Sequence, residues 1–153
     1  MLKIGDLIHD FTAPDQLGKP MTLTNLLQGG PVVIFFYPRA MTAGCTAQSC
    51  HFRDLAQDFH AVGASIVGIS SDSVERQATF DQKHRFGFPL LSDPDRIIAK
   101  QFGVKRLGPL FNRRATFVIG KDSRVIQVIA SELSMSKHAD VAIETLRHLP
   151  KST

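Results

Sequence analysis

The chain has 153 residues, with 18 Lys and Arg against 14 Asp and Glu, a net charge of +4 and 43% hydrophobic residues. A chain of this size fits one domain that can bury a core without cross-links, so it needs no disulfide framework. Its longest apolar run, PVVIFFYP, is too short to cross a bilayer, so we expect no membrane partner.

Five apolar runs rich in β-branched residues are typical of strands and lie at 31–38, 64–70, 88–93, 115–120 and 124–130. Helix-like patterns lie at 42–62, 73–86, 93–104 and 136–149. The first thirty residues are rich in glycine and proline, so we expect short strands and turns there. The last two strands follow each other around GKDS, which indicates a hairpin. This order predicts one α/β domain over residues 1–153, whose mixed central sheet is flanked by helices on both faces.

Composition also bears on compartment and partners. The opening stretch, MLKIGDLIHDF, lacks an apolar run of signal-peptide length, and two cysteines are too few for a disulfide framework, so we expect a mature cytoplasmic chain. Between positions 100 and 124 the sequence has seven basic residues and one acidic residue, Asp122. No nucleic-acid motif accompanies them, and the chain has no Trp and one Tyr for base stacking. We therefore expect a solvated loop and no nucleic-acid partner.

Both cysteines, Cys45 and Cys50, lie in the segment PRAMTAGCTAQSC, where the helix at 42–62 is expected to begin. Thr42 is a good N-cap and Pro38 cannot continue the preceding strand, so Cys45 falls at the third helical position. Unpaired backbone N–H groups and the helix dipole favour a thiolate there. Five residues of helix separate two Cα atoms by about 8.6 Å, beyond the roughly 7 Å that a disulfide tolerates. The thiols are therefore either unrelated or become partners only when the helix opens.

The wider pattern around these cysteines resembles a known active site. Pro38-x-x-x-Thr42-x-x-Cys45, a second cysteine five residues later and an arginine directly before ATFVI are similar to the active site of peroxiredoxins. The stretches FFYPRAMTAGCTAQSCHFRD, IVGISSDS, FPLLSD and RRATFVIG occur in the same order in the bacterioferritin-comigratory-protein and peroxiredoxin Q branch of that family. One departure is Ala43, because relatives often carry Thr-Pro-Gly-Cys at this point.

The resemblance implies a thioredoxin-like fold and a thiol peroxidase that reduces hydrogen peroxide and organic hydroperoxides without a metal or bound cofactor. It implies that Cys45 is the peroxidatic cysteine and that Cys50 resolves it within the same chain. It further implies that Pro38 and Thr42 shape the pocket and that Arg114 is the active-site arginine. The reductant is expected to be thioredoxin or a glutaredoxin-type dithiol protein, and the chain is expected to be a monomer.

This chemistry has two steps. The Cys45 thiolate displaces water or an alcohol from the hydroperoxide and becomes a sulfenic acid, with the Arg114 guanidinium, the Thr42 hydroxyl and the Cys45 backbone N–H donating to the departing oxygen. Cys50 then attacks the sulfenic sulfur, which requires the first helical turns to unwind. Gly44 and Ser49 lower the local helix propensity, so Gly44→Ala is expected to leave the first step near normal and to slow the second.

Several residues have other interpretations. The cysteines could be ordinary packed thiols, and Arg114 could be a surface charge, with Arg113 as the competing site residue. Gln48 is a further candidate for a partner within the site. His51 beside Cys50 suggests a metal site, but no CxxC and no second spaced His pair accompany it. The residues Phe36, Leu107, Leu110 and Phe111 either form an apolar approach for organic hydroperoxides or pack in the core.

Two other classes of function stay open. A dithiol oxidoreductase of thioredoxin type is disfavoured because Cys-x-x-x-x-Cys lacks the CxxC spacing. A metallochaperone or a redox sensor would use the same thiols without turnover. Sustained consumption of peroxide separates a peroxidase from both, because a sensor reacts once per chain and a metal carrier holds its metal.

Overall fold

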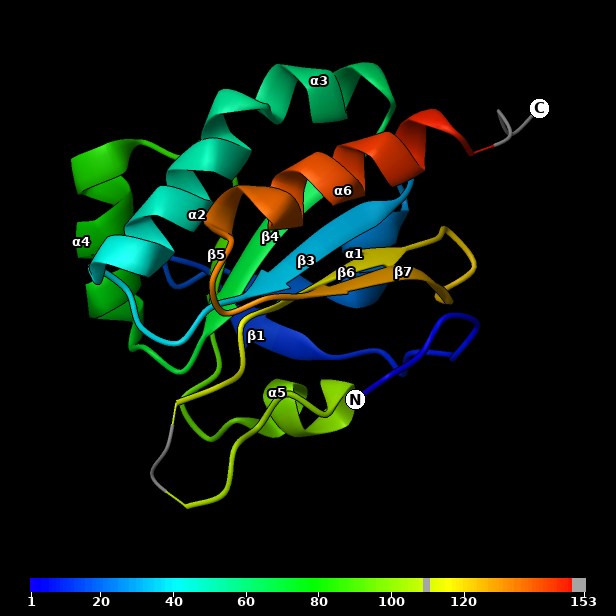
Figure 1. The fold of residues 1–153 in the computed structure, drawn as a ribbon. Helices are drawn as coiled ribbons and strands as arrows, with labels where there is room; N and C mark the ends of the chain where they lie inside the picture. The colour runs from blue at the N-terminus through cyan, green and yellow to red at the C-terminus, as the bar shows by residue number, and fades with distance from the viewer. Residues whose placement is uncertain (109–110, 150–153) are drawn as a thin grey trace.

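The computed structural model describes residues 1–108 and 111–149 (Figure 1). The strands are β1 (Thr12–Pro14), β2 (Pro20–Thr22), β3 (Val32–Phe36), β4 (Ser65–Ser70), β5 (Leu90–Ser92), β6 (Ala115–Ile119) and β7 (Val125–Ala130). The helices are α1 (Leu23–Leu27), α2 (Ala43–Asp54), α3 (Ala56–Ala61), α4 (Val74–His84), α5 (Ile97–Phe102) and α6 (Met135–Arg147). Within these described ranges, no helix is long and apolar enough to cross a membrane.

The central sheet has the strand order β5-β4-β3-β6-β7. Strand β3 pairs in parallel with β4, and β4 with β5, whereas β6 and β7 join antiparallel. Strands β1 and β2 form a separate antiparallel pair. The predicted mixed sheet, parallel at first and finished by an antiparallel hairpin, is therefore confirmed.

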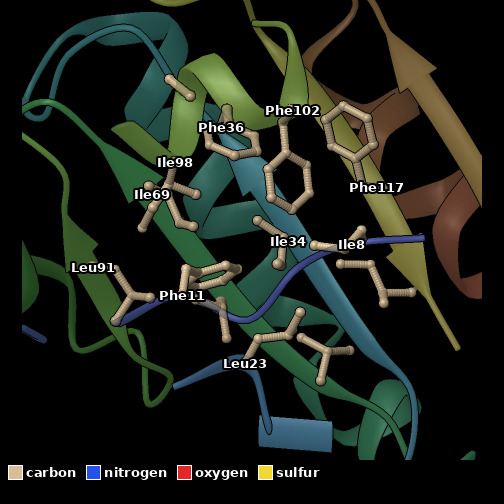
Figure 2. Close-up of a cluster of buried hydrophobic side chains, with 14 of the residues drawn as sticks. Ile8, Phe11, Leu23, Ile34, Phe36, Ile69, Leu91, Ile98, Phe102 and Phe117 are labelled. Atoms are coloured by element: carbon tan, nitrogen blue, oxygen red, sulfur yellow. The ribbon is translucent and has the colours of Figure 1, made fainter. Parts of the chain in front are cut away.

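Two apolar clusters cover the two faces of this sheet, because side chains alternate along each strand. Val32, Ile34 and Phe36 of β3 join a cluster with α1 and α5, and Figure 2 shows its aromatic centre around Phe36, Phe102 and Phe117. Val33 and Phe35 point the other way, into a cluster with α2, α3, α4 and α6. Figure 1 shows these four helices on one side of the sheet and α5 on the other, so the predicted helical layers on both faces are present.

Helix boundaries differ from the sequence expectation at three places. The expected helix at 42–62 is divided at Leu55, whose N–H is shared between the carbonyls of His51 and Phe52. Helix α5 begins later than expected because the Asp93 carboxylate accepts the backbone N–H groups of residues 97–99 and Arg96 has a φ of 56°. The short helix α1 was not expected; Thr22 caps it by accepting the Asn25 N–H at 3.1 Å.

Candidate active site

The pairing of β3 with β6 brings two distant parts of the sequence to one edge of the sheet. Phe36, the last residue of β3, lies opposite Ala115, the first residue of β6. The loop after β3 leads into α2, and Arg114 directly precedes Ala115. Because Thr116 and Val118 face the side of α6 and its cluster, the alternation also places Arg114 on that side.

Cys45 and Arg114 are in direct contact. Arg114 Nη2 donates to Cys45 Sγ at 3.4 Å, and the side chain of Cys45 is fully buried. Cys45 is the third residue of α2, where free backbone N–H groups and the helix dipole add positive potential. The sulfur is therefore buried at the positive end of a helix dipole, with a guanidinium directed at it.

Gln48 and Glu132 hold the Arg114 side chain and backbone in place. Arg114 Nη1 donates to Gln48 Oε1 at 2.6 Å, and the Arg114 backbone N–H donates to Glu132 Oε1 at 3.0 Å. Gln48 follows Cys45 by three positions on α2, a spacing that puts both side chains on one helix face. The guanidinium is thereby directed at the sulfur. Arg113, by contrast, is exposed and contributes a backbone N–H to Val104 at 2.8 Å.

Buried hydrogen bonds fix the loop that carries Pro38 to the start of α2. Asp72 accepts the Ala40 N–H at 2.7 Å and the Arg76 Nε–H at 2.8 Å, and Arg76 Nη2 donates to the Ala40 carbonyl. Tyr37, just before Pro38, donates its hydroxyl to Gln77 Oε1. Burial raises the pKa of Tyr37, so this hydroxyl stays a donor. Half-buried Pro38 thus lies in a loop fixed on both sides of it.

Thr42 occupies the N-cap of α2, but its side chain does not cap the helix. Its hydroxyl donates to the Arg39 carbonyl at 2.8 Å instead. The expected N-cap position of Thr42 is therefore confirmed, but its hydroxyl caps no helical N–H and donates to Arg39 instead of being free to donate to a departing oxygen. Since the hydroxyl proton is committed to Arg39, the free lone pairs of Thr42 Oγ1 offer an acceptor.

The structure does not bring Cys45 and Cys50 together. Both are free thiols in the unbroken helix α2, where five residues correspond to about 8.6 Å between Cα atoms. Cys50 is half-buried, and its sulfur lies 3.8 Å from His84 Nδ1 on α4. A disulfide between the two cysteines therefore requires α2 to open.

Gly44 lies against the site more closely than the sequence indicates. A methyl group at this position would lie 3.1 Å from Arg114 Nη2 and 3.5 Å from Met135 Sδ of α6. Sequence reasoning did not find Met135, because nothing local relates it to the cysteines. This close approach argues against the expectation that Gly44→Ala leaves the first step near normal.

The residues considered for an apolar approach separate into different environments. Phe36 is fully buried in the cluster on the opposite face of the sheet, so it lines no approach to Cys45. Leu107 is 89% exposed and Phe111 48% exposed, the latter with the Arg39 guanidinium 5.8 Å from its ring centre. Leu110 lies outside the described residues.

The imidazole of His51 contacts a carboxylate on α6. Its Nε2 lies 2.7 Å from Asp140 Oδ1 on α6. In residues 1–108 and 111–149, no three His, Cys, Asp or Glu side chains gather in a way that would hold a metal ion.

Comparison with known proteins places this geometry in a family. Residues 4–128 match the family model AhpC/TSA. A putative peroxiredoxin of Mycobacterium tuberculosis is 56% identical over 149 residues, covering 95% of this chain and 97% of that protein. The crystal structure of peroxidoxin BcpB from M. tuberculosis superposes with a TM-score of 0.95 at 55% identity, covering 99% of this chain and all of that one.

A more distant solved structure agrees with this assignment. It is the bacterioferritin comigratory protein of Xanthomonas campestris, which was studied for its alkyl peroxide reduction activity. It superposes with a TM-score of 0.81 at 31% identity, covering 90% of each chain. These neighbours confirm the expected thioredoxin-like fold. The chain therefore belongs to the AhpC/TSA family, and within it to the peroxiredoxins of the bacterioferritin-comigratory-protein and peroxiredoxin Q branch.

Proposed function

We propose that this thiol peroxidase reduces hydroperoxides at Cys45 and completes each cycle with Cys50. The observation that carries the proposal is the 3.4 Å contact between Arg114 Nη2 and Cys45 Sγ at the start of α2. A guanidinium that donates to sulfur stabilises the thiolate more than the thiol, because charge-assisted hydrogen bonds are the stronger ones. Cys45 is thus prepared as the nucleophile.

In the first step the Cys45 thiolate attacks one oxygen of the hydroperoxide. An S–O bond forms and the O–O bond breaks, and the leaving oxygen takes up from solvent the proton that Cys45 lost on ionising and departs as water or an alcohol. The Arg114 guanidinium can stabilise the charge that develops on that oxygen. We further propose that Thr42 Oγ1, whose own proton goes to the Arg39 carbonyl, accepts the peroxide O–H. Pro38 shapes the same pocket from the loop that Asp72 holds.

In the second step Cys50 attacks the sulfenic sulfur of Cys45, forming the disulfide and releasing water. The segment from Thr42 to Cys50 opens for this attack, because the intact helix keeps the sulfurs apart. A dithiol protein of thioredoxin or glutaredoxin type then reduces the disulfide by exchange.

Further proposals concern substrates and setting. We extend to this chain the alkyl peroxide reduction for which the X. campestris relative was studied, alongside hydrogen peroxide. Both thiols of the cycle belong to one helix of one chain, so we propose a monomer that acts as one domain over residues 1–153. Its cycle needs reduced thiols at the start, which favours the cytoplasm.

Steady-state turnover tests the proposal. Consumption of hydrogen peroxide and of a bulky alkyl hydroperoxide is measured with thioredoxin and with glutaredoxin as reductants, for the parent, Cys45→Ser and Cys50→Ser. We expect Cys45→Ser to lose all activity with its fold intact. Turnover that persists in Cys45→Ser but not in Cys50→Ser would reverse the two roles. Consumption of only one peroxide per chain would indicate a sensor.

A further inference from the structure

The resolving thiol has a partner outside its own helix. Cys50 Sγ lies 3.8 Å from Nδ1 of His84, in the last turn of α4, within the hydrogen-bonding range of sulfur. Helix α4 lies beside α2 (Figure 1), and Arg53 Nη1 of α2 donates to the His84 carbonyl at 2.8 Å. The imidazole is therefore fixed next to the Cys50 sulfur.

The surroundings of His84 favour the neutral form of its ring. The ring packs against both Phe80 and Phe86, with centroid separations of 5.5 Å to each. Burial lowers the pKa of His84, and the cations Lys83 and Arg53 lower it further. A neutral ring in the Nε2–H tautomer leaves the lone pair of Nδ1 free to accept the Cys50 proton.

The other charged groups near His84 do not compete for this role. Asp81, one helical turn earlier, accepts the Phe86 backbone N–H at 3.2 Å, and Arg85 is exposed. His51, next to Cys50 in sequence, is turned toward Asp140 on α6. His84 is the histidine whose ring nitrogen lies at the Cys50 sulfur.

We propose that His84 is the general base that activates Cys50 for the resolving step, an inference that rests on the proposed function. His84 Nδ1 takes the proton of the Cys50 thiol. The thiolate then attacks the sulfenic sulfur of Cys45, so that the S–S bond forms and the S–O bond breaks. The leaving hydroxide takes up the proton released by the imidazolium, and the products are the disulfide and water.

The position of the base on α4 suits a step that requires movement. Opening of α2 over residues 42–50 moves Cys45, while Arg53 of α2 still holds the following part of the helix against the His84 carbonyl. Cys50, at the end of the opening segment, can thus stay beside His84 Nδ1 and pass its proton to the imidazole as it attacks the sulfenic sulfur. Without a base, a thiol ionises only as the pH approaches about 8.5.

The test follows a single turnover of the full chain with hydrogen peroxide. Samples are quenched with an alkylating agent, and sulfenic acid and disulfide are counted by mass spectrometry at several pH values between about 6 and 9. His84→Gln is compared with the parent and with His51→Gln, a matched change on the other side of Cys50. We expect His84→Gln to form sulfenic acid at the parent rate and disulfide about tenfold more slowly near pH 6.5 to 7, with the deficit closing above about pH 8.5.

Three outcomes bear on the inference. A parent-like rate of disulfide formation in His84→Gln near pH 6.5 would overturn it, as would a deficit of the same size at every pH, which indicates a packing role. An equal loss in His51→Gln would also overturn it. The normal rate of sulfenic acid formation in the same sample reports that the variant is folded. Failure of the proposed function would look different, because no sulfenic acid would form at Cys45 in the parent itself.

Discussion

Gly44 lies under the guanidinium of Arg114, and a methyl group on Gly44 would lie 3.1 Å from Arg114 Nη2. The same nitrogen donates to Cys45 Sγ at 3.4 Å. Separations of 3.1 Å are tighter than ordinary van der Waals contact, so an added methyl group shifts the guanidinium away from the sulfur or strains the turn. The missing side chain at Gly44 is thus part of what allows the contact.

Gly44→Ala is therefore expected to slow the first step, about tenfold or more, because small displacements of catalytic groups are costly. The rate of sulfenic acid formation at low hydrogen peroxide measures this. Gly29→Ala is the matched control, since a methyl group there meets nothing within 4 Å. A Gly44→Ala rate equal to that of Gly29→Ala would show that Arg114 tolerates the methyl group.

Arg114→Lys should slow the attack on peroxide by about a hundredfold. A lysine keeps the charge but cannot donate to Cys45 and Gln48 with the two nitrogens of one planar group. Arg113→Lys is the control and should stay near the parent rate, because Arg113 is exposed. Both rates come from the same single-turnover measurement. Equal losses in the two variants would remove Arg114 from its assigned role.

Ser49→Ala should slow disulfide formation without changing the first attack. Within the described part of the chain, the buried Ser49 hydroxyl has no hydrogen-bond partner, so its loss relieves the folded helix, and alanine also raises helix propensity. A gain of about 1 kcal/mol makes opening about fivefold rarer. The slower resolution should expose Cys45 to over-oxidation, seen as sulfinic acid by mass spectrometry.

Ala47→Gly should have the opposite effect to Ser49→Ala, because it destabilises helix α2. Ala47 is exposed, so the substitution weakens the helix by about 1 kcal/mol with little loss of packing. Disulfide formation should become faster in this variant. If Ser49→Ala and Ala47→Gly both resolve at the parent rate, helix opening does not limit the second step.

Oxidation should remove the protection of backbone amides from Thr42 to Cys50 while the rest of the sheet stays protected. A disulfide between residues five apart cannot coexist with the hydrogen bonds of α2 in this segment. Amide hydrogen exchange on the reduced and disulfide forms measures this directly. Matching protection over residues 42–50 in both forms would contradict the opening of the helix.

His138 should make folding stability depend on pH. Its Nε2–H donates to the Ser131 carbonyl and its Nδ1 accepts the Thr116 hydroxyl, both at 2.8 Å, and burial lowers the pKa of His138. The unfolded chain, with an imidazole pKa of about 6.5, then binds more protons than the folded chain as the pH falls. The contribution of His138 is present above about pH 6.5 and is lost as the pH falls through the lower folded-state pKa.

Urea unfolding between about pH 7 and pH 5 checks this. His138→Gln should lower the free energy of unfolding at neutral pH by about 1–3 kcal/mol and should flatten its decline toward acid. His148→Gln is the control, because the His148 side chain is 76% exposed. A slope in His138→Gln as steep as in the control would assign the acid sensitivity to other groups.

The sequence predicts those parts of the fold that depend on interactions between residues close together in the chain. Runs such as VVIFF and ATFVI predict buried strands by composition alone, and the short connection GKDS between ATFVI and VIQVIA predicts the hairpin. The five-residue helix α1 is too short to show helical periodicity, and the division at Leu55 has no proline or glycine to mark it. Local patterns therefore gave the sheet and most helices, but not these boundaries.

The features of the site also divide into those that nearby residues determine and those that only the folded chain determines. The position of Cys45 in the first turn of a helix depends on neighbouring residues, and Gln48 follows from helical spacing. The direction of the Thr42 hydroxyl depends on the Arg39 carbonyl, which no pattern specifies. Met135 and His84 reach the site from α6 and α4, through packing that only the folded chain defines.

The antiparallel pairing of β3 with β6 also determines which changes in chain length the site tolerates. Arg114 faces Cys45 because it stands one residue before Ala115, and successive residues of a strand point to opposite faces. A residue inserted upstream of Arg113 leaves this alternation unchanged. A residue inserted between Arg114 and Ala115 turns Arg114 to the face of α1 and α5 and removes it from the sulfur, although every side chain of the site is retained. The segment between α5 and Arg113 can therefore vary in length among related chains. The arginine, by contrast, must directly precede the first residue of β6.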